Sequence, residues 1–402
     1  MTLTLLLDLD DTLLDNDINA FLPAYLKALG KHLSSYVPPG VMIQNLMAAT
    51  QRMLVNDSAM RSLEHSFDEV FYPAISHSKS DLRATLEYFY SEVFPELHVL
   101  TRPRPEAVQM VQYAKEQGHT LVVATNPLFP QKAIYHRLRW AGLEPDKVPF
   151  ALITTYENFH FAKPNPAYIA EILAQLGWPN QPAVMVGNSL EDDLVPAARL
   201  GMPVFWITDQ ADSLPAGFHP LSTSGGLTDV PAWLEAVDRA NPPQEFSTPE
   251  ALLAILKSTP AMLDTLSHTL TRPQWLSRPA AGEWSLTEIL CHLRDVDREV
   301  NLARFEKVID GLNPFLPGIN TDTWAQERAY QQQDGTAALR SFIEVRTHLV
   351  AQLEILEKQD WQKPARHAIF GPTNLQELVS FVATHDRSHI QQVLTAICGQ
   401  ND

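Results

Sequence analysis

The sequence predicts an α/β domain built on a parallel sheet, followed by an all-helical domain. Short apolar runs alternate with amphipathic patterns between residues 119 and 208, and this alternation is typical of a parallel sheet with helices on both faces. Residues 249–398 have an almost wholly helical pattern. The length of 402 residues also exceeds that of one ordinary domain, roughly 100 to 200 residues.

The first strand is predicted at Leu3 to Leu7, an apolar run of the kind that is buried on both faces. It ends in "DLDDT", where Asp8, Asp10 and Asp11 have two readings. They form either a solvated turn that caps the next helix or a ligand site at the carboxyl edge of the sheet. Residues 16–98 contain amphipathic stretches without comparable strands and predict a helical insertion.

Four more strands are predicted in "HTLVVATN", "FALITTYE", "AVMVGNS" and "PVFWITD". We assign residues 1–240 to the first domain, with its core at 1–15 and 99–240. The stretch "ANPPQEFSTPE" places a linker at 241–248. Beyond it, four helices near 249–270, 285–309, 336–358 and 374–398 predict a four-helix bundle over 249–402.

Composition narrows the class of protein. A net charge of -17 argues against nucleic acid as a partner. The two cysteines, Cys291 and Cys398, are too few for a disulfide framework and indicate a reducing compartment. The sequence contains no apolar segment long enough to span a bilayer and no leader pattern. We therefore expect a cytoplasmic protein without a membrane partner, and the sequence leaves a homo-oligomer open.

Polar residues follow the predicted strands at several places. Thr125 and Asn126 end one strand, Lys163 stands in the loop "AKPNP", and Asn188 and Asp193 follow another strand in "GNSLEDD". Each alone is explained by a turn, a helix cap or a solvated surface. Together and in this order, "DLDDT", "ATN", "KPNP" and "GNSLEDD" resemble the four motifs of the haloacid dehalogenase-like (HAD) superfamily over roughly residues 1–237.

This resemblance implies a Mg²⁺-dependent phosphatase with a helical cap of the C1 type. Asp8 is then the nucleophile that forms an aspartyl phosphate, and Asp10 is the acid and base. Thr125, Asn126 and Lys163 bind the phosphoryl oxygens, and Asp8, Asp10, Asn188 and Asp193 hold Mg²⁺. Asp10 favours phosphate ester hydrolysis, because halide displacement needs no proton on its leaving group. The expected substrate is a small phosphorylated metabolite.

One residue departs from this pattern. The superfamily usually has Asp at the position of Asn188, so this site has one negative charge fewer for Mg²⁺. We expect Asp193 and Asp192 to compensate, with a weaker dependence on Mg²⁺.

Histidines occupy the apolar faces of two predicted bundle helices. His385 and His389 lie in a stripe with Leu378 and Val382, and His292 shares a face with Ile289. Any single one is more often a buried, hydrogen-bonded histidine. Three imidazole nitrogens that converge instead predict a divalent metal site with open positions.

The stretches "GEWSLTEILCHLRDVD" and "ATHDRSHIQQV" resemble the DinB-like family over roughly residues 249–398. That resemblance implies that His292, His385 and His389 bind a divalent ion, often Zn or Ni. It also implies activities such as thiol-dependent S-transfer or isomerisation. Cys291 points away from this face, and Glu288 either orients His292 or is a solvated surface residue.

Three functions remain open at this point. The first is a phosphatase fused to a metal-binding domain whose activity the sequence does not specify. The second places the main activity in the bundle, as a metal-dependent S-transferase or isomerase that uses a low-molecular-weight thiol. The third is a binding or scaffold protein in which one domain is silent.

Overall fold

The computed structural model describes residues 2–208 and 213–398, and the chain forms two compact units. The first contains Met1–Asp57, Arg61–Ile172 and Pro179–Glu245. The second is mainly Phe246–Asp402, together with Ser58–Met60 and Leu173–Trp178. The linker predicted at 241–248 lies between helix α9, which ends at Ala240, and helix α10, which begins at Pro249.

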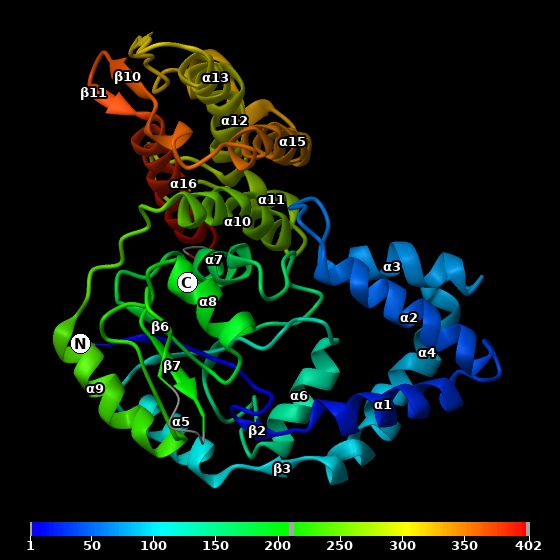
Figure 1. Cartoon of the computed structure of the whole chain (residues 1–402). Coiled ribbons are helices and arrows are strands. Elements are labelled where there is room, and N and C mark those ends of the chain that lie inside the picture. The colour runs from blue at the N-terminus through cyan, green and yellow to red at the C-terminus, as the bar shows by residue number, and fades with distance from the viewer. Residues whose placement is uncertain (1, 209–212, 399–402) are drawn as a thin grey trace. The chain divides into compact units, whose positions relative to one another are not determined.

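A six-stranded parallel sheet forms the centre of the first unit, in the order β5-β4-β1-β6-β7-β8. This confirms the predicted fold class. Figure 1 labels β6 and β7 of this sheet. Strand β1 lies between β4 and β6, with Leu7 opposite both Val123 and Val186. The carboxyl ends of these three strands therefore meet at one edge of the sheet. The strands are β1 Thr4–Leu7, β4 Thr120–Val123, β5 Phe150–Ile153, β6 Ala183–Gly187, β7 Val204–Ile207 and β8 Thr223–Gly225.

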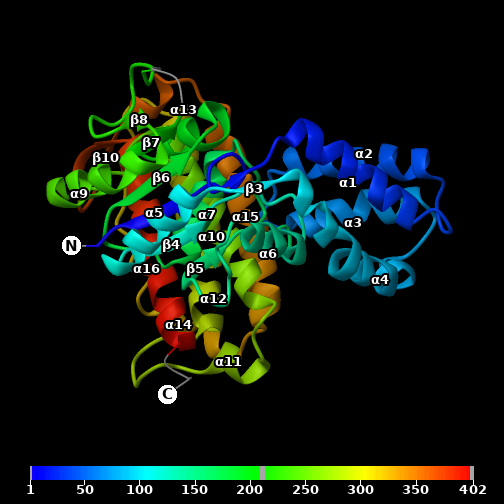
Figure 2. The ribbon, with the colours of Figure 1, turned by 90° about the horizontal axis from the view of Figure 1, so that it is seen from below.

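Helices cover this sheet in the way that the alternating pattern predicts. Apolar side chains of α5, α6 and α9 pack with those of the strands in one buried cluster. In Figure 2, α5 and α9 lie next to the sheet strands. The helical elements of this core are α5 Pro105–Glu116, α6 Gln131–Trp140, α7 Pro166–Gln175, a π-helical turn Leu190–Leu194, α8 Val195–Arg199, a 3₁₀ turn Leu227–Asp229 and α9 Val230–Ala240.

The insertion after β1 is a helical cap, which forms a separate lobe beside the sheet strands in Figure 2. The chain enters and leaves it through two short antiparallel strands, β2 Leu14–Asp15 and β3 Arg102–Pro103. The cap has its own core, in which Phe21, Tyr25, Phe89 and Phe94 are buried. Its elements are α1 Ile18–His32, α2 Pro39–Leu54, α3 Leu63–Ala74, α4 Lys79–Tyr88, a π-helical turn Phe89–Val93 and a 3₁₀ helix Phe94–Leu100.

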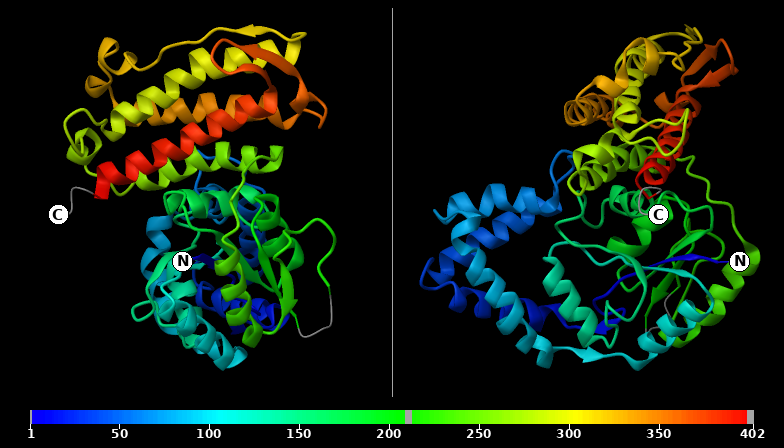
Figure 3. Two further views of the ribbon diagram at one scale, coloured as in Figure 1. Left: turned by 90° about the vertical axis from the view of Figure 1, so that its left-hand side faces the viewer. Right: turned by 180° about the vertical axis from the view of Figure 1, so that it is seen from behind.

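The second unit is a helical bundle whose long helices lie side by side in the left view of Figure 3. Helix α10 packs on α15 and α16, and α12 packs on the same two helices. The helix predicted at 285–309 is interrupted by a π-helical turn at Asp297–Asn301. The long elements are α10 Pro249–Ser267, α12 Leu286–Val296, α13 Leu302–Asp310, α15 Gly335–Glu354 and α16 Leu375–Cys398.

The bundle also carries structure that the sequence pattern missed. Strands β9 Phe315–Leu316, β10 Pro364–His367 and β11 Gly371–Asn374 form a small sheet, so the almost wholly helical prediction was incomplete. These strands have two to four residues, too few to show alternation. Short helical turns complete the unit: α11 Arg272–Leu276, α14 Trp324–Glu327, Tyr330–Gln332 and Asp360–Gln362. None of the described helices is long and apolar enough to cross a membrane.

Candidate functional site

The loop after β1 turns sharply. Asp8 continues the strand, since its backbone N–H donates to the Val186 carbonyl at 3.0 Å. Asp11 adopts a left-handed backbone with φ of 55° and accepts from the Asn16 N–H at 3.0 Å. The turn reading is therefore right for Asp11. Asp8 itself is only 6% exposed and is therefore not part of a solvated turn.

Asp8, Lys163 and Asp193 form a buried cluster. The Lys163 ammonium donates to Asp8 Oδ1 at 2.7 Å and also to Asp193 Oδ1. Burial by itself lowers the pKa of Lys163, but the facing carboxylates of Asp193 and Asp8 outweigh burial and raise it. Burial, together with repulsion from Asp8, raises the pKa of Asp193 to about 7. One ammonium is thus shared by two carboxylates in a poorly solvated place.

Gly187 makes this cluster sterically feasible. A Cβ at that position would lie 2.3 Å from Asp193 Oδ2. Asp193 Oδ2 accepts from the Ser189 N–H at 3.0 Å, so the carboxylate folds back over the end of β6. The glycine of "VGNS" therefore lets Asp193 reach Lys163.

Asp10 has partners of its own. Asp10 Oδ1 accepts from Asn16 Nδ2 at 2.7 Å, and Asp10 Oδ2 pairs with the Arg137 guanidinium. Arg137 is 1% exposed, and it also lies over the Phe129 ring, 5.2 Å from its centroid. Burial lowers the pKa of Arg137 to about 10. Sequence reasoning missed Arg137, because one arginine in an amphipathic helix carries no local signal.

The remaining predicted residues follow β4 and β6. The Thr125 carbonyl accepts from the Tyr168 hydroxyl at 2.8 Å and from the Thr154 hydroxyl at 2.7 Å, which fixes the backbone there. Asn126 Oδ1 is buried without a hydrogen-bond partner among the described residues. Asn188 Oδ1 has a long contact of 3.4 Å with the Thr12 hydroxyl. Both amide oxygens are therefore largely available to a ligand.

All of these residues line one cavity of about 430 Å³ between the sheet edge and the cap. This volume lies within the range of small-molecule sites. The structure thus brings together every residue predicted for the first site: Asp8, Asp10, Thr125, Asn126, Lys163, Asn188 and Asp193. Their catalytic and metal-binding roles stay predictions.

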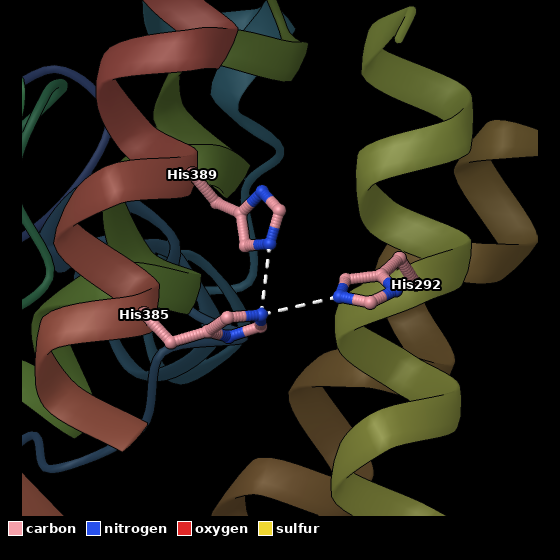
Figure 4. Close-up of side chains that lie close together, drawn as sticks. All are labelled: His292, His385 and His389. Atoms are coloured by element: carbon pink, nitrogen blue, oxygen red, sulfur yellow. Dashed lines mark hydrogen bonds between the residues drawn. The ribbon is translucent and has the colours of Figure 1, made fainter. Parts of the chain in front are cut away.

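The second site lies inside the bundle, where His292 from α12 faces His385 and His389 from α16 (Figure 4). His385 Nε2 lies 3.1 Å from His292 Nε2 and 3.0 Å from His389 Nε2. Ring nitrogens of all three lie within 4.8 Å of one another. This is the spacing that one metal ion could bridge.

The environment keeps these imidazoles neutral. Burial lowers the pKa of all three, and for His292 and His389 the neighbouring imidazoles act in the same direction. The resulting pKa is about 3 for His292 and about 4 for His385 and His389. His389 Nδ1 contacts the Gln392 side-chain oxygen at 2.8 Å. An amide oxygen accepts only, so Nδ1 carries the proton and Nε2 presents its lone pair. The Trp284 ring stacks on His389 at a centroid distance of 6.0 Å.

Two residues near the histidines have other roles than a metal ligand. Glu288 is 2% exposed and bonds to Ser285 and Arg278, so both expectations for it, a partner of His292 and a solvated surface residue, were wrong. Cys291 is buried, and its thiol contacts the Gln333 side-chain oxygen at 3.4 Å. Burial raises the pKa of Cys291 to about 11. The side chain of Cys398 lies outside the described residues.

Comparison with known families identifies both domains. Residues 2–201 match the haloacid dehalogenase-like hydrolases, and residues 255–393 match the DinB superfamily. The chain joins a HAD-like hydrolase to a DinB domain. The hydrolase domain is similar to phosphoglycolate phosphatase 1 of Pseudomonas aeruginosa, with 24% identity over 201 residues. That match covers 48% of this chain and 64% of the Pseudomonas protein.

The DinB domain is similar to the uncharacterized protein YuaE of Bacillus subtilis, with 24% identity over 128 residues. The match covers 29% of this chain and 78% of YuaE. Among solved structures, YfiT of Bacillus subtilis has 18% identity and a TM-score of 0.36, over 40% of this chain and 93% of YfiT. A HAD phosphatase of Thermococcus onnurineus has 17% identity and a TM-score of 0.37, over 61% of this chain and 100% of the Thermococcus chain.

Proposed function

We propose that the hydrolase domain is a Mg²⁺-dependent phosphatase that acts on a small phosphorylated metabolite through an aspartyl phosphate on Asp8. The observation that carries the proposal is the Lys163 ammonium, 2.7 Å from Asp8 Oδ1 at the polar end of the cavity. A nucleophilic carboxylate beside a fixed cation is what an anionic phosphoryl group requires. The reducing compartment indicated by two cysteines makes the cytoplasm the proposed setting.

The donor atoms of this site suit magnesium. Asp8, Asp10, Asn188 and Asp193 offer carboxylate and amide oxygens, the ligands that Mg²⁺ prefers. Among the described residues, Lys163 is the one ammonium that faces both the Asp8 and the Asp193 carboxylates, and burial together with repulsion from Asp8 raises the pKa of Asp193. These four residues would hold the ion. When bound, it would offset the charge of the phosphoryl oxygens.

The chain's own residues supply the steps. An Asp8 carboxylate oxygen attacks phosphorus, and the bond from phosphorus to the alcohol oxygen breaks. Asp10 gives a proton to that oxygen, then takes a proton from the water that attacks the aspartyl phosphate and releases inorganic phosphate. Both Asp10 oxygens are engaged, by Asn16 and Arg137, so Asp10 must exchange one of these partners for the leaving oxygen. Thr125, Asn126 and Lys163 hold the phosphoryl oxygens.

The histidine cluster supports a second candidate function, metal-dependent group transfer in the DinB domain. Three neutral imidazoles suit Zn or Ni better than Mg²⁺. A three-nitrogen site keeps coordination positions open for a ligand such as a low-molecular-weight thiol. S-transfer and isomerisation both remain candidates here, and the third function, a silent binding module, predicts a metal without turnover.

The variant Asp8→Asn tests the phosphatase. With Mg²⁺ and p-nitrophenyl phosphate, we expect turnover to vanish while the circular dichroism spectrum stays unchanged. Asp15→Asn, at an exposed residue of β2, is the matched control and should retain activity. Undiminished turnover in Asp8→Asn would rule out the assigned nucleophile.

Metal analysis tests the second site. Purified wild-type protein should contain a stoichiometric transition metal, and His385→Ala should lose it. His348→Ala, at an exposed position of α15, should keep the metal. Equal metal content in all three proteins would place the ion elsewhere.

A further inference from the structure

The cavity over Asp8 has two chemically different parts. The core loops contribute its charged groups at one end. The cap contributes a wall of aliphatic and aromatic side chains, and the loop before α6 extends this wall with Phe129. The main cap residues of the wall are Leu22, Leu29, Leu46, Met47, Phe67 and Phe71.

Charge in the cavity comes from the core, and its cations are already paired. Lys163 binds Asp8 and Asp193, and Arg137 binds Asp10. Among the described residues that line the cavity, the cap supplies neither an acidic nor a basic side chain. A carboxylate or second phosphate on the substrate would therefore find no free counter-ion on the cap.

The few polar groups of the cap wall also have partners. The Tyr25 and Tyr90 hydroxyls bond to each other at 2.9 Å. The Thr50 hydroxyl donates to the Leu46 carbonyl of its own helix at 2.9 Å. A hydroxyl-rich leaving group would lose water here without gaining hydrogen bonds, which is costly.

We propose that the preferred substrate is the phosphate monoester of an apolar alcohol, alkyl or aryl, whose hydrocarbon part fills the cap side of the cavity. This inference rests on the proposed phosphatase function and specifies its leaving group. Hydrolysis then releases inorganic phosphate and a neutral apolar alcohol. The apolar surface removed from water in this cavity supplies binding that a small polar metabolite does not.

The test compares substrates of increasing length on the full-length protein with Mg²⁺. The series is butyl, hexyl and octyl phosphate below their micellar concentrations, with phosphoglycolate and glycerol 3-phosphate as polar counterparts. We expect kcat/KM to rise about fourfold for each added methylene until the cavity is filled. For the polar esters, kcat/KM should be at least tenfold lower than for hexyl phosphate.

Variants locate the effect in the cap. Met47→Gln replaces a partly exposed wall residue of α2 with a polar side chain of similar shape and should flatten the dependence of kcat/KM on chain length. Val41→Gln, at an exposed residue of the same helix outside the cavity wall, is the matched control and should keep the wild-type dependence. The same flattening in both variants would argue against a specific wall.

The outcomes separate this inference from the phosphatase assignment. Turnover of p-nitrophenyl phosphate with polar esters equal to or faster than octyl phosphate would overturn the inference and leave the phosphatase intact. Calorimetry with alkyl phosphonates, which cannot be hydrolysed, provides a readout without turnover. An affinity for alkyl phosphonates that grows with chain length would support an apolar binding site on the cap side of the cavity, even if every phosphate ester were inert. An affinity independent of chain length would refute it.

Discussion

Arg346, Asp297 and Asp386 form a buried ion cluster in the DinB domain, and we expect its disruption to lower both the stability of this domain and its metal content. Arg346 of α15 is 1% exposed, and its Nε donates to Asp297 Oδ2 at 2.7 Å. The same guanidinium donates two hydrogen bonds to the Asp386 carboxylate, and the bond from Nη2 to Oδ1 measures 3.0 Å. Asp297 and Asp386 are 1% and 0% exposed. Arg346→Met therefore leaves two buried carboxylates without a cation.

The expected loss in the free energy of unfolding is about 3–5 kcal/mol, as for other buried pairs from which one partner is removed. Asp386 directly follows His385, and Asp297 begins the turn after the helix that carries His292. The cluster thus ties together the segments that position the histidines. We expect Arg346→Met to lower the metal content of the purified protein as well.

Because the chain has two compact units, its denaturation curve does not report on one of them alone. Hydrogen exchange with mass spectrometry resolves the DinB helices α12, α15 and α16 from the hydrolase strands, which serve as an internal control. Arg340→Met, at an exposed position of the same helix, should change the unfolding free energy by less than about 0.5 kcal/mol. Combining Arg346→Met with Asp297→Asn and Asp386→Leu should restore most of the loss. A loss below about 1 kcal/mol in Arg346→Met would refute the reasoning.

Three further predictions concern the two sites. Asn188→Asp adds a negative ligand, so the Mg²⁺ concentration for half-maximal phosphatase activity should fall. An unchanged value in an activity titration would show that the position does not contact the ion. Lys163→Met leaves Asp8 and Asp193 facing each other without a cation and should lower kcat/KM for p-nitrophenyl phosphate by about 10²-fold or more; a loss below tenfold would contradict its role. In metal-free protein, His292, His385 and His389 have folded-state pKa values lowered to about 3, 4 and 4, whereas unfolded imidazoles take up protons near pH 6.5. The unfolded state then binds more protons as pH falls, so the melting temperature of the DinB helices should drop between about pH 6.5 and 4, less steeply in His385→Gln. A pH-independent melting temperature would contradict the burial of neutral imidazoles.

The sequence predicted the sheet and its functional edge because both depend on short-range patterns. Strand β1 is buried along its whole length, so its residues are apolar without alternation. Once β1 lies between β4 and β6, the parallel direction brings Asp8, Thr125 and Asn188 to one edge. Helical periodicity likewise placed His385 and His389 on the inner face of α16.

Contacts between segments far apart in the chain could not be predicted in this way. Arg137 pairs with Asp10, which lies more than a hundred residues earlier in the chain. Arg346 of α15 donates to Asp386 of α16. Nothing in an amphipathic pattern distinguishes an arginine that crosses the core from one that faces water. Glu288 was misread although its partner Arg278 is near in sequence, because Arg278 lies in an irregular segment before the helix, where no periodic pattern indicates the contact.

The two proposed metal sites differ in their donor atoms. The first site offers carboxylate and amide oxygens beside a lysine, and the second offers three neutral imidazoles. Hard oxygen donors suit Mg²⁺, whereas imidazoles favour transition metals. Each proposed metal is therefore selected by its own ligands. A chelator selective for transition metals should empty the DinB domain while phosphatase activity with excess Mg²⁺ persists, and loss of both functions together would mean that the sites are coupled.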